Sequence, residues 1–88
     1  MGRYSVVFRK SVARDLRRIP NRNLSRILEA VESLSEEPRR PGVERLPGIE
    51  EKYRLRKGDY RIVFETRDDE AAVVVVKVGR RKQVYRRT

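Results

Sequence analysis

The amino-acid sequence predicts an α+β domain with the order β-α-α-β-β-β, in which a helical hairpin packs on one face of a curved, mainly antiparallel four-stranded sheet. Apolar residues recur at helical spacing between residues 12 and 34. They alternate with polar residues from 53 to 64, and consecutive valines follow from 73 to 76. The chain has 88 residues, so we expect one domain that spans residues 1–88.

The segment "RYSVVFR", residues 3–9, predicts the first strand because it is rich in β-branched and aromatic residues. The segment "KSVARDLRRIP" that follows predicts a helix, with Ser11 as its N-cap and Pro20 as its end. Its apolar positions recur at helical spacing and are expected to be buried: Val12, Leu16 and Ile19.

A second helix is predicted for "NRNLSRILEAVESLSEEP", with Asn21 or Asn23 as its N-cap and Pro38 as its end. The expected buried stripe consists of Leu24, Ile27, Leu28, Val31 and Leu34. Because only a few residues separate the two helices, we expect them to form a helical hairpin.

The segment "RRPGVERLPGIEE", residues 39–51, contains two Pro-Gly pairs and is predicted to be a loop. Three strands follow, at about residues 52–57, 60–66 and 71–79. The first two strands are joined by a turn at Lys57-Gly58-Asp59, and the last two by a turn with the sequence "RDDE". The last strand is apolar at consecutive positions, which predicts a central strand covered on both faces.

Arginines occupy alternate positions on the strands of the C-terminal half. Side chains alternate between faces along a strand, so if Leu55 faces the helices, its neighbours Arg54 and Arg56 face away. By the same alternation Arg61 lies on that open face. The parity extends to three further residues that are expected to face outward: Lys77, Arg81 and Tyr85. The open face of the sheet is therefore predicted to be basic.

The composition indicates a polyanionic partner. Lys and Arg number 23 against 13 Asp and Glu, which gives a formal net charge of +10, and 18 of the 23 cations are arginine. The chain has no cysteine and no histidine, which excludes disulfides, thiol nucleophiles and the commonest general base. No apolar run approaches the roughly 18 residues that span a bilayer, and no signal peptide is evident, so we expect a cytoplasmic protein.

Two readings of the basic face are open, a solvated surface and a binding surface. Like charges directly opposite one another destabilise a sheet, which favours an anionic ligand. RNA is favoured over a membrane surface, because the apolar faces of the helices are needed for the core. A tyrosine among arginines also suits single-stranded RNA, whose bases stack on aromatic rings while its phosphates bind cations.

Two segments together, "YRLRKGDYRIVFE" and "VVVVKVGRRKQVYRR", resemble the C-terminal half of the RelE/ParE toxin superfamily. Upstream, "YSVVFRKSVARDLRRIP", "LSEEPRRPG" and "LPG" are similar to the first strand, the helical hairpin and the connecting loop of that family. The resemblance implies a single RelE-like domain that acts as the toxin of a type II toxin–antitoxin system. It implies no cofactor, an acidic antitoxin bound in a hetero-oligomer, and mRNA cleaved in the ribosomal A site.

The resemblance also implies the site residues. The family's catalytic positions correspond to Arg54, Arg56, Arg61, Arg81 and Tyr85. Further contacts to RNA are expected from Lys57, Lys77, Arg80 and Lys82. In this scheme the 2′-hydroxyl attacks the adjacent phosphorus, arginines stabilise the charge that develops, and Arg81 protonates the leaving oxygen. No suitably placed carboxylate is evident as proton acceptor, so catalysis is expected to depend mainly on charge stabilisation and distortion of the substrate.

Two other functions stay open from the sequence. The family's ParE-like members inhibit DNA gyrase, although the five filled positions favour the nuclease branch. Arginine stands at both second-strand positions where the best-studied nucleases have lysine, which leaves a non-catalytic RNA-binding module as an alternative.

Overall fold

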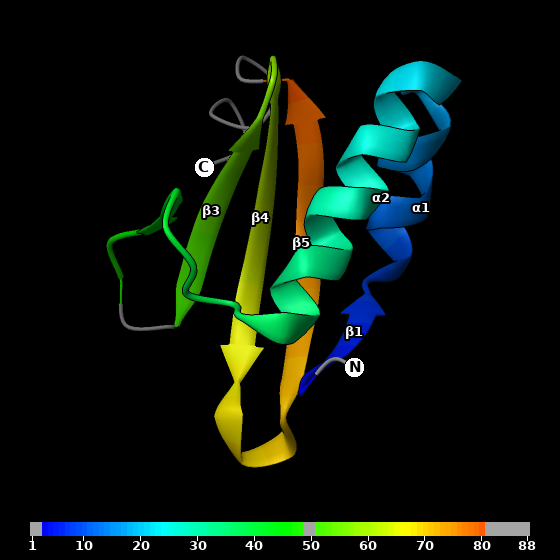
Figure 1. The fold of residues 1–88 in the computed structure, drawn as a ribbon. Helices are drawn as coiled ribbons and strands as arrows, with labels where there is room; N and C mark the ends of the chain where they lie inside the picture. Colours follow the sequence, from blue (N-terminus) through cyan, green and yellow to red (C-terminus); the bar gives the residue numbers. More distant parts are fainter. Residues whose placement is uncertain (1–2, 49–50, 81–88) are drawn as a thin grey trace.

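The computed structural model describes residues 3–48 and 51–80, which form one mixed sheet and two helices (Figure 1). The elements are β1 (Ser5–Phe8), α1 (Lys10–Arg17), α2 (Asn21–Glu36), β2 (Val43–Arg45), β3 (Lys52–Lys57), β4 (Tyr60–Arg67), the short 3₁₀ turn η1 (Asp68–Glu70) and β5 (Ala72–Arg80). No helix in this part of the chain is long and apolar enough to cross a bilayer.

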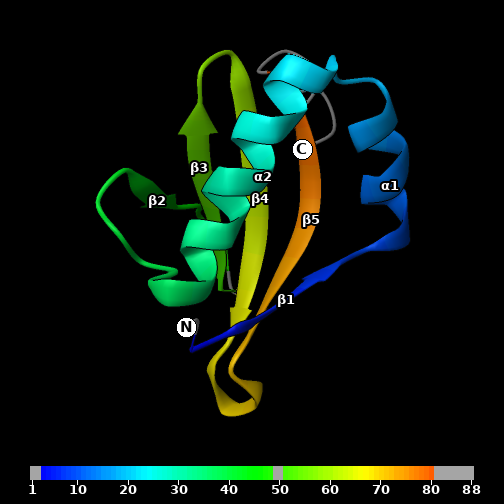
Figure 2. The same cartoon turned by 45° about the vertical axis from the view of Figure 1, so that its right-hand side comes forward.

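The strands lie in the order β1-β5-β4-β3-β2. β1 runs parallel to β5, and the other neighbours are antiparallel. Figure 2 shows α2 lying across β3, β4 and β5, with α1 beside the far half of β5, beyond the end of β1. The helices therefore cover one face of the sheet, as the sequence predicts, and β5 is a central strand.

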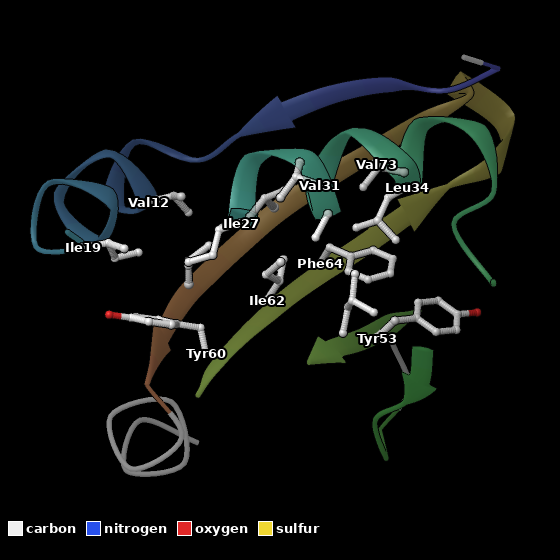
Figure 3. Close-up of a cluster of buried hydrophobic side chains, with 14 residues drawn as sticks. Val12, Ile19, Ile27, Val31, Leu34, Tyr53, Tyr60, Ile62, Phe64 and Val73 are labelled. Carbon is white, nitrogen blue, oxygen red and sulfur yellow. The ribbon is translucent and has the colours of Figure 1, made fainter. Parts of the chain in front are cut away.

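The core lies between the two helices and the sheet (Figure 3). Its members are the apolar residues that the periodicities predict to face one another: Val12, Ile19, Ile27, Ala30, Val31, Leu34, Tyr53, Leu55, Tyr60, Ile62, Phe64, Val73, Val75 and Val78. Alternation along β3 and β4 sends the intervening residues to the opposite face. The α+β class is confirmed, with a sheet of five strands where four are predicted.

The fifth strand is β2, which lies inside the segment 39–51 that is predicted to be a loop. Three residues between two Pro-Gly pairs are too few to give an alternation signal. The strand exists because β3 offers it a partner, with Val43 opposite Leu55 and Arg45 opposite Tyr53. This correction matters for function, because Glu44 lies between these two pairs.

The predicted helix caps are wrong. Helix α1 begins at Lys10 after Arg9, and α2 begins at Asn21 after Pro20, in both cases without a side-chain capping bond. Ser11 lies inside the first turn of α1. On α2, Leu28 is 41% exposed and does not join the buried stripe, whereas Ala30, which the sequence does not place in that stripe, is buried.

A polar network ties the connection between α2 and β2 to the sheet. The Arg39 guanidinium donates to Tyr53 Oη at 3.2 Å, to Thr66 Oγ1 at 3.2 Å and to Asp68 Oδ2 at 2.8 Å. The hydrogen bond from Arg39 holds the pKa of Asp68 below its ordinary value. The chain that leads into β2 is therefore anchored to β3 and β4 before β2 begins.

We predict that Leu34→Ala lowers the free energy of unfolding by about 2–5 kcal/mol, because it removes methyl groups from a fully buried position. Leu28→Ala on the same helix is the matched control, since 41% of that residue is exposed, and we expect a change within about 0.5 kcal/mol. Urea unfolding followed by circular dichroism measures both. Equal effects of the two substitutions would contradict the assigned core face of α2.

Candidate functional site

Three arginines from β3 and β4 lie together on the face of the sheet away from the helices. We call Arg54, Arg56 and Arg61 the arginine cluster. Arg56 and Arg61 are direct cross-strand partners, and Arg54 lies two residues before Arg56 on the same face of β3. The register is set by a two-residue connection in which Gly58 has a φ of 61°, a left-handed conformation that glycine adopts without strain.

The members of the arginine cluster differ in exposure. Arg61 is 6% exposed, and its guanidinium donates to the Tyr60 carbonyl at 3.3 Å. The Arg54 side chain is 13% exposed, whereas that of Arg56 is 62% exposed. Two guanidinium groups are thus held within the surface and a third reaches from the same patch into solvent. Fixed cations of this kind can stabilise developing charge without reorganising first.

Strand β2 brings a carboxylate to the arginine cluster. Glu44 is the cross-strand partner of Arg54, and its Oε1 accepts a hydrogen bond from an Arg54 Nη at 2.8 Å. The same oxygen lies 3.9 Å from an Arg56 Nη. The hydrogen bond and the charge of Arg54, with smaller effects of Arg56 and Arg61, hold the pKa of Glu44 below its ordinary value. Glu44 is therefore ionised near neutral pH.

The sequence predicts no suitably placed carboxylate, whereas the structure brings Glu44 to two arginines of the cluster. The sequence contains one hint, an apolar–polar alternation in "VERL" between the two Pro-Gly pairs, and it is too short to predict a strand. Among the described residues, one carboxylate faces the three guanidinium groups of the cluster, so positive charge predominates at this end of the face. An anion can therefore still be attracted to the arginine cluster.

The strand register places Lys77 on the open face of the sheet, but its side chain pairs with an acidic residue of α1. Between the pairs Val63–Lys77 and Phe64–Val75 the register shifts, so that β5 carries one extra residue, Val76. The Lys77 ammonium contacts Asp15 Oδ1 at 3.0 Å. The other Asp15 oxygen accepts from the Val78 N–H at 3.2 Å, so this carboxylate of α1 covers the edge of β5 beyond the end of β1.

Lys57 and Arg80 do not join the arginine cluster. Both are cross-strand partners of Tyr60, whose side chain belongs to the core on the helix side of the sheet. The Arg80 guanidinium lies over the Tyr60 ring, with its carbon 5.8 Å from the ring centre. Its hydrogen bond with Tyr60 raises the pKa of Arg80. The expected RNA contacts thus divide between two faces of the molecule.

Three sequence-predicted site residues, Arg81, Lys82 and Tyr85, lie outside the described residues. Within residues 3–48 and 51–80, no three acidic side chains come close enough together to form a metal site. The described part of the candidate site therefore consists of the arginine cluster and Glu44.

The chain matches the family model described as "ParE toxin of type II toxin-antitoxin system, parDE" over residues 6–85. It is 34% identical over 85 residues to Toxin RelG of Mycobacterium tuberculosis, covering 96% of this chain and 98% of the relative. It is 32% identical over 84 residues to Toxin RelE of the same organism, covering 94% of this chain and 87% of the relative.

Solved structures agree with the sequence matches. The fold is similar to that of the archaeal RelE-RelB complex from Pyrococcus horikoshii, with a TM-score of 0.80, 30% identity, and coverage of 90% of this chain and 96% of that one. The fold is also similar to that of the toxin–antitoxin complex RelBE2 from Mycobacterium tuberculosis. The TM-score is 0.80, the sequence identity is 31%, and the match covers 89% of this chain and 98% of that one. The chain therefore belongs to the RelE/ParE superfamily of type II toxin–antitoxin toxins, and lies with its RelE-like members.

Proposed function

We propose that the protein is the toxin of a type II toxin–antitoxin system and cleaves mRNA on the ribosome, in the A site, by 2′-hydroxyl attack without a metal ion. The observation that carries the proposal is the gathering of Arg54, Arg56 and Arg61 around a position that one carboxylate, Glu44, already reaches. That arrangement supplies both charge stabilisation and a proton acceptor. Family membership supports the reaction class.

The reaction needs three tasks at one phosphodiester. The 2′-oxygen forms a bond to phosphorus while the bond to the 5′-oxygen breaks, which gives a 2′,3′-cyclic phosphate and a free 5′-hydroxyl. A base takes the 2′-proton, cations stabilise the extra negative charge on the phosphorane, and an acid protonates the 5′-oxygen.

The arginine cluster suits the second task. Guanidinium groups bind phosphate oxygens through two parallel N–H bonds, and their charge is permanent at any physiological pH. Arg61 is held within the surface by its bond to the Tyr60 carbonyl, and the exposed Arg56 beside it can close on a phosphate as it arrives. This permanent charge takes the electrostatic role that a divalent cation would otherwise fill, which supports a metal-independent reaction.

Glu44 suits the first task. It is ionised near neutral pH, and its oxygen lies within 2.8–3.9 Å of two guanidinium groups that would hold the phosphate. A depressed pKa keeps the carboxylate ready but makes it a weak base. Positioning of the substrate by the ribosome would compensate for a weak base, which supports ribosome dependence. We assign leaving-group protonation to Arg81 and base stacking to Tyr85.

The same charge pattern fits the regulation of a toxin. An antitoxin with an acidic segment would neutralise the basic face by folding over it in a hetero-oligomer. RelE relatives are found in complexes with RelB, as their structures state. We propose such a partner here, and action in the cytoplasm, where the ribosome and mRNA are found.

We predict that Arg61→Ala lowers the rate of mRNA cleavage by about 100-fold or more, because it removes a held cation from the developing phosphorane. The measurement is primer extension on transcripts translated in vitro, with and without ribosomes. Arg67→Ala is the matched control, since this arginine lies on the same strand and pairs with Glu65 away from the cluster. Full toxicity of Arg61→Ala, or intact transcripts with a gyrase-linked DNA-damage response, would refute the nuclease proposal.

We predict that Glu44→Gln lowers the cleavage rate by about 100-fold or more, because glutamine cannot accept the 2′-proton. We expect the cleavage activity of the native protein to fall as the pH drops through the Glu44 pKa. Because that pKa is lowered, the fall should occur at a lower pH than for an ordinary glutamate. This loss of activity at low pH should be absent in Glu44→Gln. NMR titration of the carboxyl group should show its pKa rising in Arg54→Ala. If Glu44→Gln lost activity at low pH as the native protein does, the proton transfer would belong to another group.

A further inference from the structure

Strand β2 carries Glu44, yet its backbone alone gives it little to hold it in place. It is three residues long, lies at the edge of the sheet, and is exposed at two of its three positions. Pairing with a single neighbouring strand is marginal in water unless other contacts support it. The reach of the Glu44 carboxylate to Arg54 therefore depends on whatever else fixes β2 against β3.

The two residues that flank Glu44 face the helix side of the sheet. Val43 lies opposite Leu55 and Arg45 lies opposite Tyr53, and both of these partners belong to the core. Val43 itself is partly buried against the core. Because side chains alternate along a strand, the contacts of Val43 and Arg45 on one face fix the position of Glu44 on the other.

Five side chains form a continuous polar chain that ends on β2. We call this chain the β2 anchor, and its members are Asp68, Arg39, Tyr53, Glu51 and Arg45. The Arg39 guanidinium donates to both Asp68 and Tyr53. The Tyr53 hydroxyl donates in turn to Glu51 Oε2 at 2.8 Å, and Glu51 Oε1 accepts a bond from Arg45 at 3.2 Å. The anchor thus runs from the end of β4 to the residue that follows Glu44.

Tyr53 is the central link of the β2 anchor. The two ion pairs of the anchor are solvent-exposed, and exposed pairs contribute little by themselves. The Tyr53 ring is buried and stacks on Phe64, with 5.6 Å between the ring centres. Its hydroxyl points outward from the core (Figure 3). Because the core holds the ring, the hydroxyl gives Arg39 and Glu51 a fixed point of attachment.

The β2 anchor is balanced in charge. Its two guanidinium groups pair with its two carboxylates, Arg39 with Asp68 and Arg45 with Glu51. Hydrogen bonds with Tyr53 and Asp68 raise the pKa of Arg39 above its ordinary value, so this cation keeps its charge. Any effect of the anchor on Glu44 therefore acts through the position of β2 and not through added charge.

We propose that the β2 anchor holds Glu44 in place as proton acceptor, and that Arg39 and Tyr53 are positioning residues for the cleavage reaction. This inference rests on the proposed function. A displacement of about 1 Å of a reacting group can lower a rate by about 100-fold. Loss of the anchor would displace Glu44 with β2, whereas the arginine cluster comes from β3 and β4 and would keep its place.

The test is Tyr53→Phe in the full chain, which removes one hydroxyl and keeps the buried ring. We expect kcat for cleavage of transcripts on ribosomes to fall about tenfold or more, with KM changed less than about twofold, because the cations that bind the phosphate remain. Adding Tyr53→Phe to Arg39→Ala should lower kcat no further than Arg39→Ala alone, since both act through one chain of contacts. The matched control is Tyr4→Phe, which removes a hydroxyl that donates to Asp68 at 3.1 Å outside the anchor, and it should keep the native kcat.

Two measurements on the purified protein do not depend on cleavage. NMR titration should show the Glu44 pKa rising toward its ordinary value in Tyr53→Phe, because the carboxylate moves away from Arg54. Hydrogen exchange of the Leu46 N–H, which donates to the Lys52 carbonyl at 2.9 Å just after β2, should speed up by about tenfold or more.

A general loss of stability gives a different result. Leu34→Ala destabilises the core without touching the β2 anchor, so the Glu44 pKa should stay at its native value there and in Tyr4→Phe. If Tyr53→Phe leaves the Glu44 pKa and the Leu46 exchange rate as they are in Tyr4→Phe, the inference is wrong. Failure of the proposed function would appear separately, as uncut transcripts with the native protein, and the titration and exchange would still decide whether the anchor holds Glu44 beside Arg54.

Discussion

The alternation of side chains along β3 and β4 is the constraint on which the rest of the molecule depends. Leu55 and Ile62 must face α2 to complete a thin core, so Arg54, Arg56 and Arg61 must face the other way. The hairpin register then sets Arg56 directly against Arg61. Burial of the apolar residues on one face thus directs the arginines to the other face. Glu44 partly relieves the repulsion between these arginines.

Positive charge is distributed by layer. On the open face it is concentrated, partly buried and arranged around a carboxylate, which suits chemistry at one phosphodiester. On the helical hairpin it is exposed and spread along two helices. Asp15 of α1 engages Lys77 and covers the edge of β5. The two basic regions therefore differ in exposure and in their acidic neighbours.

Sequence periodicity by itself determined the class of the fold, the strands from residue 52 onward, the central place of the valine-rich strand and the direction of Arg54, Arg56 and Arg61. Each of these follows from local alternation or helical spacing together with the need to bury one face. The predicted N-cap at Ser11 and the predicted burial of Leu28 are wrong, because propensity and spacing alone do not determine where a helix begins or how it packs on the sheet.

Only the tertiary structure decided the features that need a partner from elsewhere in the chain. Strand β2 forms because β3 pairs with it, and that pairing carries Glu44 to Arg54, ten residues along the chain. The extra residue at Val76 and the Asp15 contact, 62 residues away from Lys77, direct that lysine to α1. Lys57 and Arg80 flank Tyr60 because register places them there. Such contacts depend on strand pairing over long distances, which a local pattern of residues does not record.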